Sequence, residues 1–294
     1  MLWSSNDVTL QGSRPKTKLV NDHIYSSNYS MNNTSKIDLP FIRQKITEKV
    51  EKNVDLFESS VLSVYLKKNN SREKPLQIGT AFFINHLNNQ YLITAQHVIQ
   101  QASLDGFPVF LSKCGQFFRL SEIKSHDGYE ASNKVLDFYI FKTIKNPGGI
   151  RGLNIAWQND ESIKEICLTM GYPNSRNKTR IDVDNKNAKS TILRLTLSNR
   201  KSSGEIIADL PNTPHFLMPW EKKALDNEWK NIDSIGIRGM SGAPCFNIPF
   251  SQKDIFEEAP AQEGVKLIGV LIEMRKEEIK FLKFSNLIGY FPVS

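Results

Sequence analysis

Hydrophobic residues along this chain fall mostly into short runs, which are separated by polar residues and turn formers. The runs are rich in β-branched and aromatic side chains, which favour strands over helices. They cover residues 61–67, 80–85, 107–111, 136–141, 166–170 and 191–197. Short strands at this spacing predict a mainly β fold of the sandwich or barrel type rather than alternating βαβ units.

The N-terminal region has a different pattern. Residues 1 to about 37 are rich in Ser, Asn, Lys and Asp, and such a segment buries too little apolar surface to offset its ordering entropy, which predicts a flexible arm. Asp38 and Pro40 then supply the signals of a helix start. The helix that follows has one apolar face, formed by Ile42, Ile46, Val50, Val54 and Phe57. We expect this helix to pack on the outside of a barrel; binding of a regulatory partner is the alternative.

Composition and net charge indicate which partners and which cellular compartment to expect. The 294 residues carry a formal net charge of +7, which could indicate nucleic-acid binding, but no dense basic block or RNA-binding signature is present. A solvated, lysine-rich surface is therefore the favoured interpretation. No apolar run is long enough to cross a bilayer, and the first residues lack the pattern of a secretory signal. The cysteines, Cys114, Cys167 and Cys245, have no disulfide-framework spacing, so we expect a cytoplasmic protein that does not bind membranes.

Two short motifs carry the candidate chemistry. Residues 239–244 read Gly-Met-Ser-Gly-Ala-Pro, and residues 92–97 read Leu-Ile-Thr-Ala-Gln-His. A serine hydroxyl needs a positioned base to take its proton, and a histidine base needs a third group that fixes its tautomer. Asp137 begins an apolar run and is suited to that role, whereas Asp127 lies in a turn-like context. We therefore favour a set made of His97, Asp137 and Ser241.

At these motifs the chain resembles the trypsin-like (chymotrypsin-fold) serine peptidases, in particular the bacterial members without disulfides. The chain order of histidine, aspartate and serine is the one used by that fold. Three further segments are similar to family strands: one precedes the histidine, one opens the second barrel and one follows the nucleophile, at residues 79–84, 167–173 and 267–272. The resemblance implies two six-stranded antiparallel β-barrels with an N-terminal helical extension. The expected domains are residues 1–57 for the extension, 58–147 for the first barrel and 148–294 for the second barrel.

The same resemblance implies a function. The protein would be a serine endopeptidase that hydrolyses peptide bonds through an acyl-enzyme, with a protein or peptide as substrate and with no metal or cofactor. His97 would be the general base, Asp137 would orient it and Ser241 would be the nucleophile. The backbone N–H groups of Gly239 and Ser241 would form the oxyanion hole. Loss of one such donor costs about 3 kcal/mol of transition-state stabilisation.

Residues that contact substrate follow from the same alignment of motifs. Ile235 would form the floor of the primary pocket, and an apolar floor favours an apolar side chain over Lys or Arg. Arg238 would lie at the lip of that pocket. Ile272 would end the strand that pairs with the substrate backbone, and Glu273 and Arg275 would follow that strand. Ile272 also occupies a position where the family often has a Ser or Thr that helps hold the aspartate, so Asp137 is expected to be less well oriented.

One more departure from the family concerns activation. Met240 stands where secreted trypsins have an aspartate that pairs with a new N-terminus, so that ion pair is excluded here. The extension of residues 1–57 is then the candidate for a regulatory contact. Two other functions stay open, namely a catalytically weak or inactive binding module on a protease fold, and a less favoured nucleic-acid-binding protein.

Overall fold

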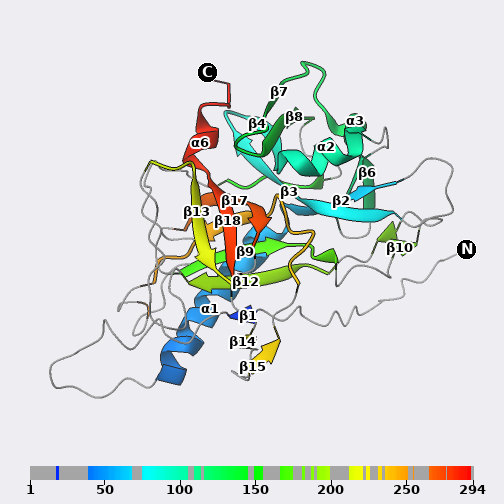
Figure 1. Cartoon of the computed structure of the whole chain (residues 1–294). Coiled ribbons are helices and arrows are strands. Elements are labelled where there is room, and N and C mark those ends of the chain that lie inside the picture. The colour runs from blue at the N-terminus through cyan, green and yellow to red at the C-terminus, as the bar shows by residue number, and fades with distance from the viewer. Residues whose placement is uncertain are drawn as a thin grey trace, which may run out of the picture.

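The runs of β-branched and aromatic residues form strands, and the strands build two large sheets that meet at the centre of the molecule (Figure 1). The computed structural model describes residues 18–19, 39–67, 75–104, 109–113, 116–144, 149–154, 166–174, 181–182, 187–188, 191–198, 212–220, 223–225, 231–233, 236–250, 254, 265–275 and 277–292. Within these ranges the fold is mainly β with two sheets, so the fold-class prediction is confirmed. The number of strands in each sheet differs from the expected six.

The first sheet has seven strands in the order β6-β5-β2-β3-β4-β8-β7, and all neighbours are antiparallel. They are β2 (Val61–Leu66), β3 (Leu76–His86), β4 (Asn89–Thr94), β5 (Val109–Lys113), β6 (Gln116–Arg119), β7 (Glu130–Asn133) and β8 (Phe138–Thr143). The short helices α2 (Gln96–Leu104) and α3 (Leu120–Ile123) lie in the connections. Phe82, Leu92 and Ile140 are fully buried between the strands.

The second sheet has nine strands in the order β13-β18-β17-β16-β9-β12-β1-β14-β15. They are β1 (Lys18–Leu19), β9 (Ile166–Gly171), β12 (Leu193–Ser198), β13 (His215–Pro219), β14 (Lys223–Leu225), β15 (Asn231–Asp233), β16 (Pro244–Asn247), β17 (Lys266–Met274) and β18 (Glu278–Lys283). The strands from β13 to β12 are antiparallel, and β12 also lies against β13, so this set curves round on itself. A separate hairpin joins β10 (Ile181–Asp182) to β11 (Asn187–Ala188).

The additional strands of the second sheet include a piece of the N-terminal arm. β1 runs parallel to β12 and antiparallel to β14, and β14 pairs in turn with β15. Backbone pairing of this kind needs no apolar side chains, which explains why the polar pattern of the arm did not predict a strand at Lys18–Leu19. The rest of residues 1–38 lies outside the described part of the chain.

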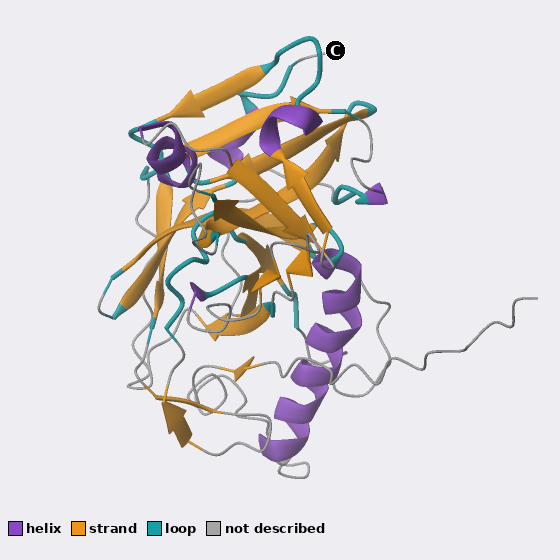
Figure 2. Cartoon of the chain, turned by 90° about the vertical axis from the view of Figure 1, so that its right-hand side faces the viewer, coloured by secondary structure: helices purple, strands orange, loops and turns teal. Residues whose placement is uncertain are grey.

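The helix α1 (Leu39–Glu58) is packed onto the second sheet and lies in the lower part of the molecule in both views (Figure 1, Figure 2). Its apolar face is buried in the main hydrophobic core, and Val50 and Val54 have no exposed surface. Phe57 stacks on Phe246 of β16, with ring centroids 4.4 Å apart. Arg194 of β12, which is 6% exposed, binds the carboxylates of both Glu51 and Glu58 on the helix. These contacts make α1 an integral part of the packing around β12 and β16.

The C-terminal segment crosses from the second sheet to the first. After β18 the chain forms α6 (Ser285–Ile288), and the residues that follow pack on aromatic side chains of the first sheet. The ring of Phe291 lies 5.2 Å from that of Tyr91, and Tyr290 lies 4.6 Å from Phe138. The two sheets are thus joined by packed side chains as well as by the connecting chain.

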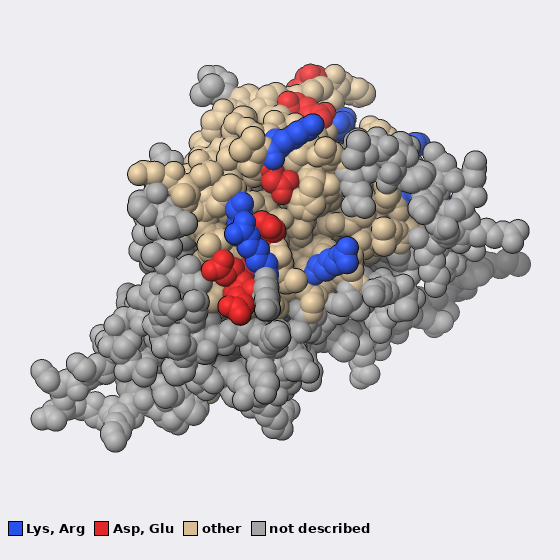
Figure 3. Space-filling model, in the orientation of Figure 1, with Lys and Arg blue, Asp and Glu red and all other residues tan. Residues whose placement is uncertain are grey.

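Two properties of the described surface bear on partners. None of the helices in the described ranges is both long enough and apolar enough to span a membrane. On the face shown in Figure 3, blue Lys and Arg side chains of the described residues lie beside red acidic ones and form no continuous basic stripe.

Candidate active site

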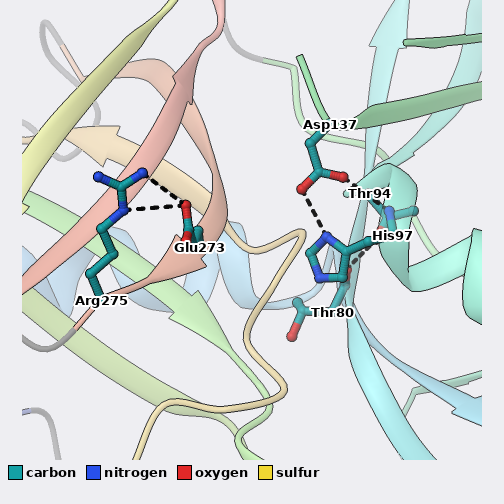
Figure 4. A network of polar contacts seen from close by, with 6 residues as sticks. All are labelled: Thr80, Thr94, His97, Asp137, Glu273 and Arg275. Atoms are coloured by element: carbon teal, nitrogen blue, oxygen red, sulfur yellow. Dashed lines mark hydrogen bonds and ion pairs between the residues drawn. The ribbon is translucent and has the colours of Figure 1, made fainter. Parts of the chain in front are cut away.

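His97 and Asp137 meet at the edge of the first sheet. His97 is the second residue of α2, so its backbone N–H has no acceptor within the helix and is free to bind elsewhere. This N–H donates to Oδ1 of Asp137 at 2.9 Å, and the Nδ1 atom of the His97 ring lies 2.8 Å from Oδ2 (Figure 4). An ionised carboxylate can only accept, so Nδ1 carries the proton and Nε2 keeps its lone pair. The ring is 48% exposed, and in its neutral form Nε2 would be the nitrogen that can accept a proton.

A strained turn places the aspartate. Asp137 has a positive φ of 59°, a conformation that Asp adopts more readily than most side chains. The turn before it is held by Asn133, whose Oδ1 accepts the N–H groups of Val135 and Leu136 at 2.9 and 3.0 Å. The rival Asp127 instead pairs with Lys142, and this hydrogen bond lowers the pKa of Asp127. The structure therefore brings Asp137, and not Asp127, to His97.

Ser241 lies in a tight turn wedged between the two sheets. Its backbone carbonyl accepts the N–H of Thr80 on β3 at 2.8 Å, and the N–H of Gly242 donates to the carbonyl of Leu271 on β17 at 2.7 Å. Gly242 has a φ of 90°, and a Cβ there would lie 2.0 Å from the carbonyl oxygen of Thr80. Only glycine fits such a position. The half-buried Ser241 is thus held beside the end of β4, from which the chain leads directly to His97.

Hydrogen bonds fix the orientation of two peptides, the one between Arg238 and Gly239 and the one between Met240 and Ser241. The carbonyl of Arg238 accepts the N–H of Asn174 at 2.7 Å, and the carbonyl of Met240 accepts the N–H of Ala243 at 2.9 Å. In a trans peptide the following N–H points the opposite way. The N–H groups of Gly239 and Ser241 therefore point away from these acceptors, and within the described ranges neither donates a hydrogen bond. Two unpaired N–H groups two residues apart can bind an oxyanion.

The predicted substrate-binding residues lie on the second sheet or beside it. Ile272 is buried in β17, whereas Glu273 is exposed and pairs with Arg275 at 3.3 Å. Figure 4 shows this pair on the side of the view opposite His97. Arg238 is exposed in the turn that precedes Ser241. Ile235, the expected floor of the primary pocket, lies outside the described residues.

Two groups near the site escaped the sequence interpretation. Thr80 donates hydrogen bonds to the carbonyls of the two neighbours of Met240, from its hydroxyl to Gly239 and from its backbone N–H to Ser241. The sequence motif that contains Thr80 did not indicate this role. His215 of β13 was interpreted as an ordinary surface or core histidine. Burial lowers its pKa, Lys280 lowers it further, and Asp137 acts in the opposite direction, which shows that this ring lies close to the candidate acid.

The buried thiols cannot replace the serine. Burial, together with contact to Cys167, raises the pKa of Cys245 well above its ordinary value, so the nucleophilic thiolate is suppressed. Both of these cysteines are fully buried, and neither forms a disulfide within the described residues. Within the part of the chain that is described, no group of three or more His, Cys, Asp or Glu could hold a metal ion.

Comparison with known proteins does not assign this chain to a family. No protein-family model matches the chain, and no curated protein sequence matches it. Among solved structures, it is similar to a serine endoprotease from Yersinia pestis, with a TM-score of 0.42 and 15% sequence identity. The match covers 81% of this chain and 63% of that one, so the chain spans less than two thirds of that protein. The chemistry must therefore be inferred from the side chains of the site.

Proposed function

We propose that this protein is a serine endopeptidase of the trypsin-like type, with His97, Asp137 and Ser241 as its catalytic residues. The observation that carries the proposal is the double contact between His97 and Asp137, at 2.9 and 2.8 Å, beside a glycine-flanked serine. The contact leaves Nε2 of His97 as the only basic nitrogen of the ring. The backbone N–H groups of Gly239 and Ser241, which donate no hydrogen bond within the described residues, would form the oxyanion hole.

The proposed reaction has two steps. The Ser241 oxygen attacks the carbonyl carbon of a peptide bond while Nε2 of His97 takes its proton, and Asp137 stabilises the imidazolium that forms. The N–H groups of Gly239 and Ser241 bind the developing oxyanion. The C–N bond then breaks, His97 protonates the leaving amine, and water hydrolyses the acyl-enzyme by the same route in reverse. The chemistry uses only groups of the chain itself and the substrate.

A fluorophosphonate probe tests this proposal directly, because an activated serine displaces its fluoride and becomes covalently phosphonylated. Wild type should be labelled at one site, and Ser241→Ala should not be labelled. Ser132→Ala, which removes an exposed hydroxyl from β7, is the matched control and should behave as wild type. Labelling of Ser241→Ala at the wild-type rate would assign the probe to another residue and refute the proposal.

One observation favours a second candidate, a protease-fold binding module with little or no activity. Within the described ranges, the carboxylate of Asp137 accepts hydrogen bonds from His97 alone, and Ile272 offers no hydroxyl to it. Failure of folded wild type to react with the probe would favour this module.

Specificity, partners and location belong to the same proposal. We place Ile235 at the floor of an apolar primary pocket, and cleavage of a peptide library mainly after Lys or Arg would contradict this. Glu273 and Arg238 would then contact substrate at the rim. Two free buried thiols suit a reducing compartment, which supports a cytoplasmic location. A regulatory partner would have to bind the outer side of α1, because its apolar face is already buried.

A further inference from the structure

Thr80 makes an unusual number of hydrogen bonds for a residue outside the predicted catalytic set. Its hydroxyl is fully buried, donates to the carbonyl of Gly239 at 3.2 Å and accepts the N–H of Tyr172 at 3.0 Å. Its own N–H donates to the carbonyl of Ser241 at 2.8 Å. All three bonds lead from β3 of the first sheet to segments of the second sheet.

The hydroxyl of Thr80 also links two turns to each other. One turn follows β9 and includes Tyr172 and Asn174; the other contains Gly239. Asn174 already holds the carbonyl of Arg238 through its backbone N–H. A Cβ on Gly239 would lie 2.4 Å from the Asn174 side chain, so the two turns are in direct contact. Thr80, which belongs to the first sheet, forms a hydrogen bond to each of these two turns through its hydroxyl.

The consequence concerns the freedom of Gly239. A glycine can adopt either sign of φ at little cost, and here its φ is 96°, a value that residues with a side chain rarely adopt. The Thr80 hydroxyl fixes the peptide after Gly239, and Asn174 fixes the peptide before it. Without the hydroxyl, the carbonyl of Gly239 and the N–H of Tyr172 would both lose a buried partner. Rotation about Gly239 would then become easier.

We propose that Thr80 is a positioning residue, whose hydroxyl holds the Gly239 N–H in the orientation that binds the oxyanion. The proposal rests on the proposed endopeptidase function, but the geometry of the turn can be tested separately. Within the described residues no hydrogen bond joins Thr80 to His97. Thr80 acts through Gly239, so its effect should appear in the chemical step rather than in substrate binding.

The test compares variants that differ in a single hydroxyl. Thr80→Val keeps the shape of the side chain and removes the hydroxyl, whereas Thr80→Ser keeps the hydroxyl. Thr143→Val is the matched control, because Thr143 is also buried and also donates to a backbone carbonyl, that of Gln90 at 3.2 Å. Thr80→Ala makes the same comparison if the valine variant does not fold.

Peptide-ester hydrolysis and probe labelling measure the catalytic effect. Thr80→Val should lower kcat and the labelling rate about 10- to 100-fold, less than the loss of a complete oxyanion donor, with KM changed by less than about threefold. Thr80→Ser should recover most of the rate, and Thr143→Val should match wild type. Equal rates for Thr80→Val and Thr143→Val would overturn the proposal, as would a change confined to KM.

Hydrogen–deuterium exchange measures the turn without any need for activity. Thr80→Val should increase exchange in a peptide that covers residues 236–243, while Thr143→Val should leave that peptide unchanged. If wild type does not react with the probe, the endopeptidase function fails, and exchange alone decides on Thr80. Unchanged exchange of residues 236–243 in Thr80→Val would then show that its hydroxyl does not position this turn.

Discussion

The contact between α1 and the strand that follows Ser241 gives a quantitative prediction. Phe57 is 2% exposed and stacks on Phe246 with an interplanar angle of 16°. Truncation of a buried phenylalanine to alanine costs about 3–5 kcal/mol, because apolar contacts are lost and a cavity remains. Phe57→Ala should therefore lower the free energy of unfolding by about 4 kcal/mol. A loss of this size is a large part of the stability of a typical domain.

The stacked pair itself should account for part of that loss. Aromatic pairs contribute about 0.5–1.5 kcal/mol beyond the area that they bury. A double-mutant cycle of Phe57→Ala and Phe246→Ala should therefore give a coupling energy of about 1 kcal/mol. Urea unfolding followed by tryptophan fluorescence supplies the four free energies of the cycle.

A residue on the same helix provides the control. Phe41 is 39% exposed, so Phe41→Ala should change the stability by no more than about 0.5 kcal/mol. If Phe57→Ala costs no more than Phe41→Ala, α1 is not a structural part of the second sheet. Altered probe labelling per folded molecule, with unaltered stability, would instead support the regulatory interpretation of the helix.

Two further substitutions test the acid and the histidine beside it. Asp137→Asn should lower kcat about 10⁴-fold, because an amide offers one acceptor to the two donors of His97 and leaves the ring in the wrong tautomer. Hydrolysis of a peptide ester measures kcat, and a loss below tenfold would contradict the prediction. Burial and the charges of Lys280 and Arg275 lower the pKa of His215 from 6.5, although the charge of Asp137 acts in the opposite direction. As the pH falls below 6.5, His215 is therefore protonated in the unfolded state before it is protonated in the folded state. Stability should then fall on acidification through that range, and His215→Gln should show a smaller drop in Tm between pH 7.5 and 5.5; equal drops would exclude His215 as a source of acid sensitivity.

The sequence predicted well those features that depend on side-chain type along one segment. Apolar runs became strands, and the helix-start signal at Asp38 and Pro40 agrees with a helix that begins at Leu39. The contact between His97 and Asp137 was expected from motifs alone. In each case the predictive signal lies within a few neighbouring residues.

Features that depend on which backbone groups face each other were not predictable in this way. The bonds from Thr80 to Gly239 and Tyr172 join residues that are 159 and 92 positions apart. Nothing in a threonine's neighbours indicates which distant carbonyl it will meet. The strand at Lys18–Leu19 is a similar case, because its partners are backbone groups of β12 and β14.

Ile272 occupies a position where the resemblance to trypsin-like peptidases implies a hydroxyl that helps hold the aspartate. Asp137 was therefore expected to be less well oriented. Both carboxylate oxygens are nevertheless engaged, one by the His97 backbone and one by its ring. Within the described residues, the hydrogen bonds that orient the acid come from the first sheet, namely from His97 of α2, and the turn before Asp137 is held by Asn133.

The serine turn, in contrast, depends on both sheets. Its carbonyls are held by Thr80 from β3 and by Asn174 after β9, and Gly242 binds Leu271 of β17. The His97–Asp137 pair and the turn that carries Ser241 thus belong to different halves of the molecule, and Thr80 hydrogen-bonds this turn to the first sheet. Movement of one sheet relative to the other would change the distance between His97 and Ser241, whereas the His97–Asp137 pair would stay intact because both residues belong to the first sheet. Substitutions at this junction should therefore reduce the rate of acylation while the His97–Asp137 pair remains intact.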